Sequence, residues 1–315
     1  MKVAFLGTPA VAVPFLDALL DAGHDVDPVV TRPDRPVGRS DRLRPPPVKQ
    51  RAVERGRTVL QPRGARGSAF AETLRAADLD ALVVVAYGRI LPRAVLDAAR
   101  HGAVNVHFSL LPKYRGAAPV QWALACGETV TGVCTMRLDE GMDTGDVLGT
   151  TAVEIGHNEH APSLHRRLVE VGTVLLLETL ERLGTGRARP EPQDHEAATY
   201  APLLTREDGH VAPSDLARRI EGRIRGFDPW PGVWLARAGR RIRLIEAQAL
   251  PEESTDAAPG TVLDRVDGAG VRIACGEGTV LGVTRVQAEG RRAVAVEDAI
   301  RGRQLAAGDR LERIV

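Results

Sequence analysis

One segment organises the chain, and it reads His101-Gly-Ala-Val-Asn105-Val-His107-Phe-Ser-Leu-Leu-Pro112-Lys-Tyr-Arg-Gly116. Apolar residues from position 103 onward lead without a break into polar ones, which predicts a buried strand whose carboxyl end carries polar side chains. Side chains alternate along a strand, so Asn105 and His107 share one face and Phe108 takes the other. One face is therefore available for chemistry, and the other is available for packing.

An amide beside an imidazole supplies the groups needed to hold a carbonyl oxygen as it becomes an oxyanion, and histidine also moves protons near neutral pH. The chain has eight histidines, and a lone histidine is usually structural or solvated. Only His107 follows an amide, Asn105, on the same predicted strand face. Asp143 lies later in a glycine-bracketed loop, Asp139-Glu-Gly-Met-Asp143-Thr-Gly-Asp146, and completes a candidate site by orienting the imidazole. This chemistry requires no metal and no cysteine.

The amino-terminal half alternates predicted strands and helices, with strands expected at 2–6, 26–31 and 79–86. This order predicts an α/β fold with a mainly parallel sheet covered on both faces. Sites in such sheets lie beyond the carboxyl ends of the strands, where Thr8, Tyr87 and Asn105 fall. Gly7-Thr-Pro9-Ala10 lacks the second and third glycines of a dinucleotide fingerprint, so a nicotinamide dehydrogenase is a poor interpretation.

The second half of the chain changes character after a long predicted helix at 163–183. Two strands, at 131–137 and 147–155, bracket the Asp143 loop. Glycine, proline and polar residues dominate 184–205, as is typical of a linker, and about five short strands follow. We therefore expect a first domain at 1–189, a linker at 190–206 and a small β-barrel domain at 207–315.

Length and composition set further bounds. At 315 residues the chain is long enough for two cores, and its net charge of +1 argues against a surface that binds nucleic acid throughout. The three cysteines lack the spacing of a zinc site or a disulfide framework. No apolar run approaches the roughly 20 residues of a membrane span. We expect a soluble, cytoplasmic monomer that binds neither membranes nor DNA.

The segment from Thr31 to Arg51 is locally basic, with seven basic residues against two acidic ones. Arg35, Arg39 and Arg42 are its candidate contacts. Charged surface loops are common, so a solvated loop is one interpretation. A phosphate-contacting arm is the other, because clustered arginines attract nucleic acid phosphates. The residues alone leave both open.

Several motifs together resemble one family, the 10-formyltetrahydrofolate-dependent formyltransferases, and in particular those that act on initiator methionyl-tRNA. They are Asn105-x-His107, Ser109-Leu-Leu-Pro112-x-Tyr-Arg-Gly116, Asp143-Thr-Gly-Asp146, Gly7-Thr-Pro9, Pro33-Asp-Arg-Pro-x-Gly38-Arg39, Ala86-Tyr-Gly88, Ala117-Ala-Pro119 and Phe227-Asp-Pro-Trp-Pro231-Gly. They are spread over nearly the whole chain. Phe108 departs from the family pattern, which usually has glycine there, and Leu203 stands where a basic residue is usual.

The resemblance implies a Rossmann-like formyltransferase domain followed by an OB-like barrel that helps to hold tRNA. It implies 10-formyltetrahydrofolate as the formyl donor and the α-amino group of initiator methionyl-tRNA as the acceptor, a step of translation initiation. The catalytic residues would be Asn105, His107 and Asp143. The folate pocket would be lined by Ser109, Leu110, Leu111, Pro112, Tyr87, Gly88 and Ile90, and Arg35, Arg39 and Arg42 would contact tRNA.

Two alternatives come from other classes. A formyltransferase for another amine, such as an amino sugar nucleotide or glycinamide ribonucleotide, would keep the three catalytic residues but not the basic segment joined to a second barrel. A non-catalytic RNA-binding protein would need the basic segment but not the Asn-x-His strand. Phe108 is expected to point into the core with ordinary β dihedral angles, because a bulky side chain is strained at positive φ.

Overall fold

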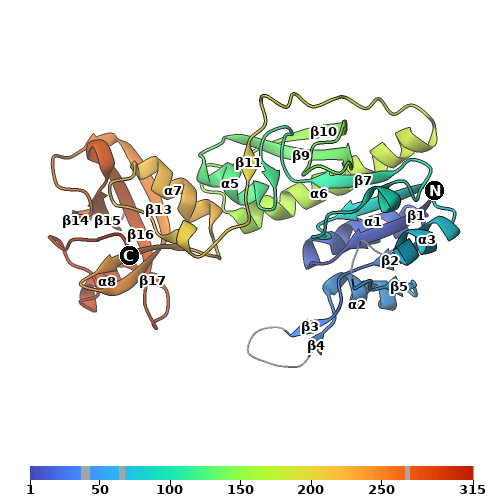
Figure 1. Ribbon diagram of the computed structural model, residues 1–315. Coiled ribbons are helices and arrows are strands. Elements are labelled where there is room, and N and C mark those ends of the chain that lie inside the picture. Colours follow the sequence, from blue (N-terminus) through green and yellow to red (C-terminus); the bar gives the residue numbers. More distant parts are fainter. Residues whose placement is uncertain (37–42, 64–67, 267–269, 315) are drawn as a thin grey trace. The chain divides into compact units, whose positions relative to one another are not determined.

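The computed structural model describes residues 1–36, 43–63, 68–266 and 270–314. These residues form two compact units (Figure 1). The first unit comprises Met1–Gly116, Thr131–Val153 and Arg166–Tyr200, and the second comprises Ala117–Val130, Glu154–His165 and Ala201–Val315.

The first unit is built on a seven-stranded sheet with the order β10-β9-β7-β6-β1-β2-β5. Its strands are β1 (Lys2–Gly7), β2 (Asp25–Val30), β5 (Val59–Leu60), β6 (Ala81–Val85), β7 (Ala103–His107), β9 (Val130–Arg137) and β10 (Val147–Glu154). The pairs β1–β2, β1–β6, β2–β5 and β6–β7 are parallel, and β7–β9 is antiparallel. The predicted α/β fold with a mainly parallel sheet is confirmed.

The central strands are apolar throughout, as expected where both faces of a parallel sheet are covered. All five residues of β6 are buried. The helices of this unit are η1 (Ala10–Ala12), α1 (Val13–Asp21), α2 (Pro47–Glu54), α3 (Ser68–Ala76), α4 (Arg93–Leu96) and, from Arg166 onward, α6 (Ala161–Gly184). Proline stands in the first turn of α1 and of α2, where its missing N–H costs nothing. None of the helices in the described ranges combines the length and the apolar character that a bilayer span requires.

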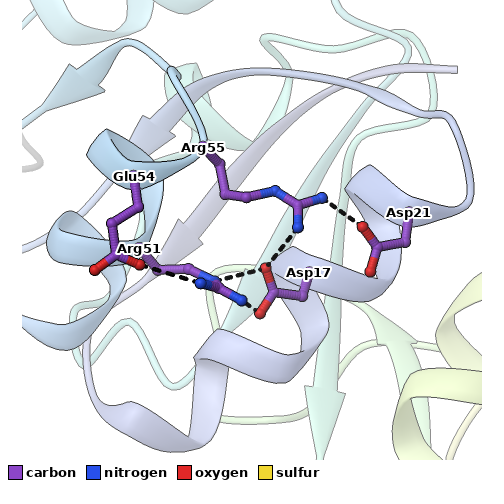
Figure 2. A network of polar contacts seen from close by, with 5 residues as sticks. All are labelled: Asp17, Asp21, Arg51, Glu54 and Arg55. Atoms are coloured by element: carbon purple, nitrogen blue, oxygen red, sulfur yellow. Dashed lines mark hydrogen bonds and ion pairs between the residues drawn. The ribbon is translucent and has the colours of Figure 1, made fainter.

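An ion-pair network joins α1 to α2 (Figure 2). Arg51 Nε donates to both carboxylate oxygens of Asp17, at 2.8 and 2.9 Å, and its Nη1 reaches Glu54 at 3.1 Å. Arg55 approaches Asp17 at 3.7 Å and also pairs with Asp21. Asp17 accordingly holds the pKa of Arg51 above its ordinary value. The network fixes α2, which contains the last residues of the basic segment.

The basic segment itself contains a two-stranded ribbon, β3 (Arg35–Pro36) and β4 (Leu43–Arg44), in which Arg35 lies opposite Arg44. Figure 1 shows this ribbon projecting from the unit below β2 and α2. Arg39 and Arg42, which the sequence proposed as contacts, lie outside the described residues.

The second unit is a helix-flanked antiparallel sheet with the order β12-β13-β16-β15-β14. Its strands are β12 (Val233–Arg237), β13 (Arg240–Ser254), β14 (Val262–Val266), β15 (Gly270–Ala274), β16 (Thr279–Ala288) and β17 (Val294–Ala295), and its helices are α5 (Pro119–Ala125), α7 (Ala217–Gly226) and α8 (Val296–Arg301). The tail closes the sheet, because Arg310 bridges to Thr261 beside β14 and Glu312 bridges to Ala236 in β12. The predicted small barrel is confirmed.

Helices α5 and α7 approach closely through glycine. A Cβ atom on Gly226 would lie 2.3 Å from the Gln121 carbonyl oxygen, so only glycine fits there. Phe227 then packs edge-on against Trp122, with ring centroids 5.4 Å apart. As a compact unit, helix α5 and residues 154–165 group with the carboxyl-terminal half. The functional division at 189 and 207 stays a prediction.

Candidate active site

The polar end of β7 carries the first two candidate residues. Asn105 pairs through its backbone with Val84 of β6 and with Met136 of β9, so β7 is held on both sides. His107 is 5% exposed, and Asn105 is half-buried. Within the described part of the chain, the Asn105 amide makes no side-chain hydrogen bond. It is therefore a donor positioned by a rigid strand and available to a ligand.

The His107 ring is held by the backbone of a neighbouring loop. Its Nε2 lies 2.9 Å from the carbonyl oxygen of Tyr114. A carbonyl only accepts, so Nε2 carries a hydrogen and donates. Nδ1 is then the nitrogen free to take up or release a proton, and it lies 3.7 Å from Oδ2 of Asp143. That distance is too long for a hydrogen bond and becomes an ion-pair contact only when the ring is protonated.

Asp143 is oriented by groups other than the imidazole. Its Oδ2 accepts a hydrogen bond from the N–H of Gly116 at 2.8 Å, and its backbone has φ +54°, a strained conformation for a non-glycine residue. The sequence predicted that His107 would be fixed by donating to this carboxylate. In the structure Tyr114 fixes the ring and Gly116 fixes the carboxylate, and the two side chains face each other.

A buried hydrogen-bond chain supports the Asp143 loop, and the sequence pattern did not predict it. Gln193 donates from Nε2 to the carbonyl oxygens of Asp143 and Gly145, at 3.0 and 2.6 Å. Its Oε1 accepts from Nε and Nη2 of Arg115, at 3.1 and 2.7 Å. Arg115 is only 2% exposed, and its Nη2 also donates to Nδ1 of His195 at 3.0 Å. Gln193 lies in a stretch with the composition of a linker, so nothing local marks it as part of a site.

The segment after β7 folds into a tight turn. Ser109 is fully buried, and its hydroxyl donates to the Lys113 carbonyl at 2.6 Å. Leu110 packs against β9, where a Cβ atom on Gly132 would lie 2.4 Å from Leu110 Cδ2. Leu111 and Pro112 are partly exposed. Ser109 therefore shapes the turn, and the two residues after Leu110 present apolar surface.

The segment after β6 holds the other predicted folate residues. Tyr87 is 1% exposed, Gly88 has φ +75°, and Ile90 is 71% exposed. Thr8, at the end of β1, donates from Oγ1 to the Tyr87 carbonyl at 3.2 Å. Because β6 is the neighbour of β7, this segment and the His107 turn lie at the same edge of the sheet.

Two of the basic residues counted in the segment from 31 to 51 are engaged within the protein. Lys49 donates to both carboxylate oxygens of Asp34, at 2.9 and 2.8 Å, and to Gln61. The hydrogen bond from Lys49, and then that from Gln61, lowers the pKa of Asp34. Arg51 belongs to the network with Asp17. Arg35 is exposed on β3, as its predicted contact with tRNA requires.

Phe108 faces the core, as predicted from strand alternation. It is 8% exposed and packs edge-on against Phe15 of α1, with ring centroids 6.1 Å apart. Phe108 is not among the residues with positive φ. The aromatic ring therefore fills the space between the sheet and α1.

This geometry suits acyl transfer to a nucleophile: an amide donor and an imidazole lie on one strand of a Rossmann-like sheet, and the imidazole faces a carboxylate. The described residues contain no group of three or more metal-binding side chains arranged around one point. Solved structures with this fold include a sugar 3N-formyl transferase, with a TM-score of 0.67 and 15% identity over 93% of this chain and 99% of that one. A second is the N-formyltransferase of Helicobacter canadensis, with a TM-score of 0.68 and 16% identity over 90% and 98%. At these identities the likeness concerns the fold alone.

Sequence comparison defines the family. Residues 1–180 match the formyl transferase model, and residues 203–304 match the model of the formyl transferase C-terminal domain. A protein of Acidobacterium capsulatum is 49% identical over 312 residues, which cover 99% of this chain and 99% of that protein. One of Anaeromyxobacter dehalogenans is 49% identical over 302 residues, covering 96% and 97%. The chain belongs to the formyl transferase family. Both of these full-length relatives are named methionyl-tRNA formyltransferase.

Proposed function

We propose that this protein transfers the formyl group of 10-formyltetrahydrofolate to the α-amino group of methionine esterified to initiator tRNA. The observation that carries the proposal is the full-length match, at 49% identity, to relatives named methionyl-tRNA formyltransferase. Asn105, His107 and Asp143 then have roles that fit this chemistry. We place the reaction in the cytoplasm, in a monomer whose residues 1–189 carry catalysis and whose barrel, 207–315, helps to hold tRNA.

Asn105 is assigned to the developing oxyanion. Attack of the neutral amine on the formyl carbon drives negative charge onto the formyl oxygen, and a positioned N–H donor lowers the energy of that state. The free amide of Asn105, on a strand paired on both sides, supports this role. No reorganisation is needed when the charge appears, because the strand fixes the donor beforehand.

His107 and Asp143 are assigned to the protons. Nδ1 of His107 faces Asp143 at 3.7 Å, so a proton taken from the attacking amine has two acceptors close together. When Nδ1 is protonated, the imidazolium stabilises the oxyanion. The same proton is then available to the leaving nitrogen of the folate. The reaction needs no covalent enzyme intermediate.

The formyl donor requires an apolar wall beside the catalytic residues. Leu111 and Pro112 present partly exposed apolar surface after β7, and Ile90, after the neighbouring strand β6, is largely exposed. Such surface fits the flat ring system of a folate. Ser109, Leu110, Tyr87 and Gly88 are proposed to shape that wall.

Two competing functions are separated by one experiment. A labelled formyl donor is incubated with initiator methionyl-tRNA, elongator methionyl-tRNA, glycinamide ribonucleotide and an amino sugar nucleotide. We expect transfer to initiator methionyl-tRNA. Transfer to the sugar instead would support the other acceptor class, and tRNA binding without transfer would support an RNA-binding protein.

The basic segment is proposed to contact the tRNA acceptor end through Arg35, Arg39 and Arg42. Replacing all three with glutamine should flatten the salt dependence of tRNA binding by roughly 0.7 to 0.9 in slope for each lost phosphate contact. Donor binding should hardly change. An unchanged salt slope would return the segment to the solvated-loop interpretation.

A further inference from the structure

A cluster of arginines without carboxylate partners lies at the edge of the sheet beside the candidate active site. Arg32 follows β2 by two residues, and Arg89 follows β6 by four. Burial lowers the pKa of Arg32, and the positive charges of Arg35 and Arg89 lower it further. Within the described residues, none of these three arginines forms an ion pair with a carboxylate. Three like charges are therefore held together without neutralisation.

The nearest carboxylate along the chain does not relieve this charge. Asp34 lies between Arg32 and Arg35 in sequence, but its oxygens are taken by Lys49 and Gln61. Across the β3–β4 ribbon, Arg35 stands opposite Arg44. Like charges placed directly opposite destabilise a strand pair. The arrangement favours an anion supplied from outside.

Buried polar atoms in the same region also lack partners. The hydroxyl of Tyr87, the Nε of Arg32 and the Oγ1 of Thr31 are all buried without a hydrogen bond among the described residues. Burial raises the pKa of Tyr87, and the neighbouring Arg89 guanidinium lowers it in part. Arg89 also donates from Nη1 to the carbonyl oxygen of Pro62 at 2.9 Å. Such atoms are costly to leave unsatisfied. Tyr87 is 1% exposed, so its unmet donor is fixed in place.

Gly88 brings the backbone close to the cluster. Gly88 has φ +75°, and a Cβ atom there would lie 3.4 Å from Nη1 of Arg32. The guanidinium therefore runs past the backbone between Tyr87 and Arg89. The side chains of Arg32, Arg89 and Tyr87 thus come together from two strand ends that are far apart in the sequence.

The distance from the cluster to His107 is comparable to the length of one nucleoside. In the order β7-β6-β1-β2, the end of β6 is one strand from His107 and the end of β2 is three strands away. Adjacent strands are about 4.8 Å apart, so the cluster begins about 5 Å from β7 and extends to about 15 Å. In aminoacyl-tRNA, the first phosphodiester lies one nucleoside from the reacting amine. A guanidinium fork matches a phosphate in shape and charge.

We propose that Arg32, Arg35 and Arg89, with the hydroxyl of Tyr87, form a phosphate subsite for the phosphodiester next to the aminoacylated nucleoside of tRNA. This rests on the proposed function. The subsite sets how far along the sheet edge the methionyl group can reach, and so it helps to place the amine at Asn105 and His107. A carboxylate of the folate is the competing occupant.

Two short acceptors test the subsite directly. One is adenosine carrying methionine, and the other is cytidylyl-adenosine carrying methionine, which adds one phosphodiester. The wild-type protein should prefer the dinucleotide by about tenfold or more in kcat/KM, the size expected for one charge-assisted contact. Arg32→Gln and Arg89→Gln should each lose most of this preference. A preference retained in both variants would overturn the proposal.

The other arms separate the remaining outcomes. If a folate carboxylate occupies the cluster, Arg32→Gln raises the KM for the donor and affects both acceptors equally, which also overturns the proposal. Binding of intact initiator tRNA needs no catalysis, and Arg32→Gln should reduce its salt slope by roughly 0.7. That readout stands even if neither short acceptor is formylated, whereas absence of transfer to intact initiator methionyl-tRNA would end the proposed function. Arg100→Gln, which breaks a surface pair with Asp80 at 3.2 Å, is the matched control, and melting curves confirm folding.

Discussion

The catalytic corner, which comprises His107 and the Asp143 loop, and the basic segment are held in place by different physical means. At the corner, His107, Asp143 and the loop carbonyls are positioned by hydrogen bonds, several of them from buried groups such as Arg115 and Gln193. The basic segment is anchored by ion pairs such as Lys49–Asp34, which remain partly open to solvent. Buried hydrogen bonds fix direction, whereas exposed ion pairs are weak and screened by salt.

The difference matches what each region has to do. Transfer chemistry depends on atoms held to within fractions of an ångström. Phosphate contacts act through charge over longer distances and tolerate movement of the chain. Changes at the corner should therefore be large and specific, and changes at the segment should be small, dependent on salt and confined to the RNA.

The largest effect on stability is expected beneath the corner, at Phe108. Phe108→Ala should reduce the free energy of unfolding by about 3 to 5 kcal/mol, because removing a buried ring leaves a cavity between the sheet and α1. Chemical denaturation measures this loss. The rate per folded molecule should stay within a few fold.

A double-mutant cycle with Phe15 tests the packing of Phe108. Their edge-on contact should give a coupling of about 0.5 to 1.5 kcal/mol in a double-mutant cycle with Phe15→Ala. Unchanged stability with a raised KM for the donor would show that Phe108 lines the folate pocket instead.

The catalytic residues should affect rate rather than binding. Asn105→Ala, His107→Ala or Asp143→Ala should each slow the chemical step by about 10² or more and leave tRNA affinity within a few fold, since the lost contacts belong to the transition state. Single-turnover rates and tRNA binding are measured on the same preparations. His101→Ala, at the other end of β7, is the control, and a near-normal single-turnover rate for His107→Ala would remove the proposed role.

Gln193 should act on the reaction through the Asp143 loop. Gln193→Leu should slow kcat by about tenfold with little change in KM, because the loop carbonyls lose two donors and the carboxylate is less well placed. Gln193→Glu keeps an acceptor for Arg115 but cannot donate, so it should be about as slow. Gln287→Leu, in the other unit, is the control. Normal kcat for Gln193→Glu would mean that Arg115 alone positions the loop.

The features that the sequence was sufficient to predict are those that depend on a local pattern of residues. The apolar run at 81–85 and the alternation around Asn105 and His107 place the central strands and the catalytic face, and the inward direction of Phe108 follows from the same alternation. Glycine-bracketed Asp143 was recognisable as a loop residue. These features depend on residues close together in the chain.

What the sequence missed depends on contacts between distant residues. Gln193 lies in a linker-like stretch and reaches the Asp143 loop only through the fold. The donor to the Asp143 carboxylate is a backbone N–H, that of Gly116, which has no residue-type signature. The close approach of α5 to Gly226 likewise joins residues just over one hundred positions apart. The ion pairs of Lys49 with Asp34 and of Arg51 with Asp17 likewise have no signature in the local charge of the basic segment.

The smallest expected effect concerns Asp34, at the base of the basic segment. Its pKa lies below the ordinary value of 3.8 because Lys49, and then Gln61, donate to its carboxylate. Lys49→Met should raise this pKa toward 3.8, and Gln61→Leu should raise it less. Carbon chemical shifts of the carboxyl group, followed from about pH 2 to 6, measure both.

The sign of the linked stability follows from the direction of the shift. A carboxyl group with a depressed pKa in the folded state stabilises the fold above its unfolded pKa, and that contribution is lost as the pH falls through the folded value. The Lys49–Asp34 pair should therefore act fully at neutral pH and fade only in acid. Since the pair is partly exposed, added salt should weaken it. If Lys49→Met left the titration of Asp34 unchanged, this ion pair would not anchor the basic segment. Exposed ion pairs would then not be what distinguishes the segment from the hydrogen-bonded catalytic corner.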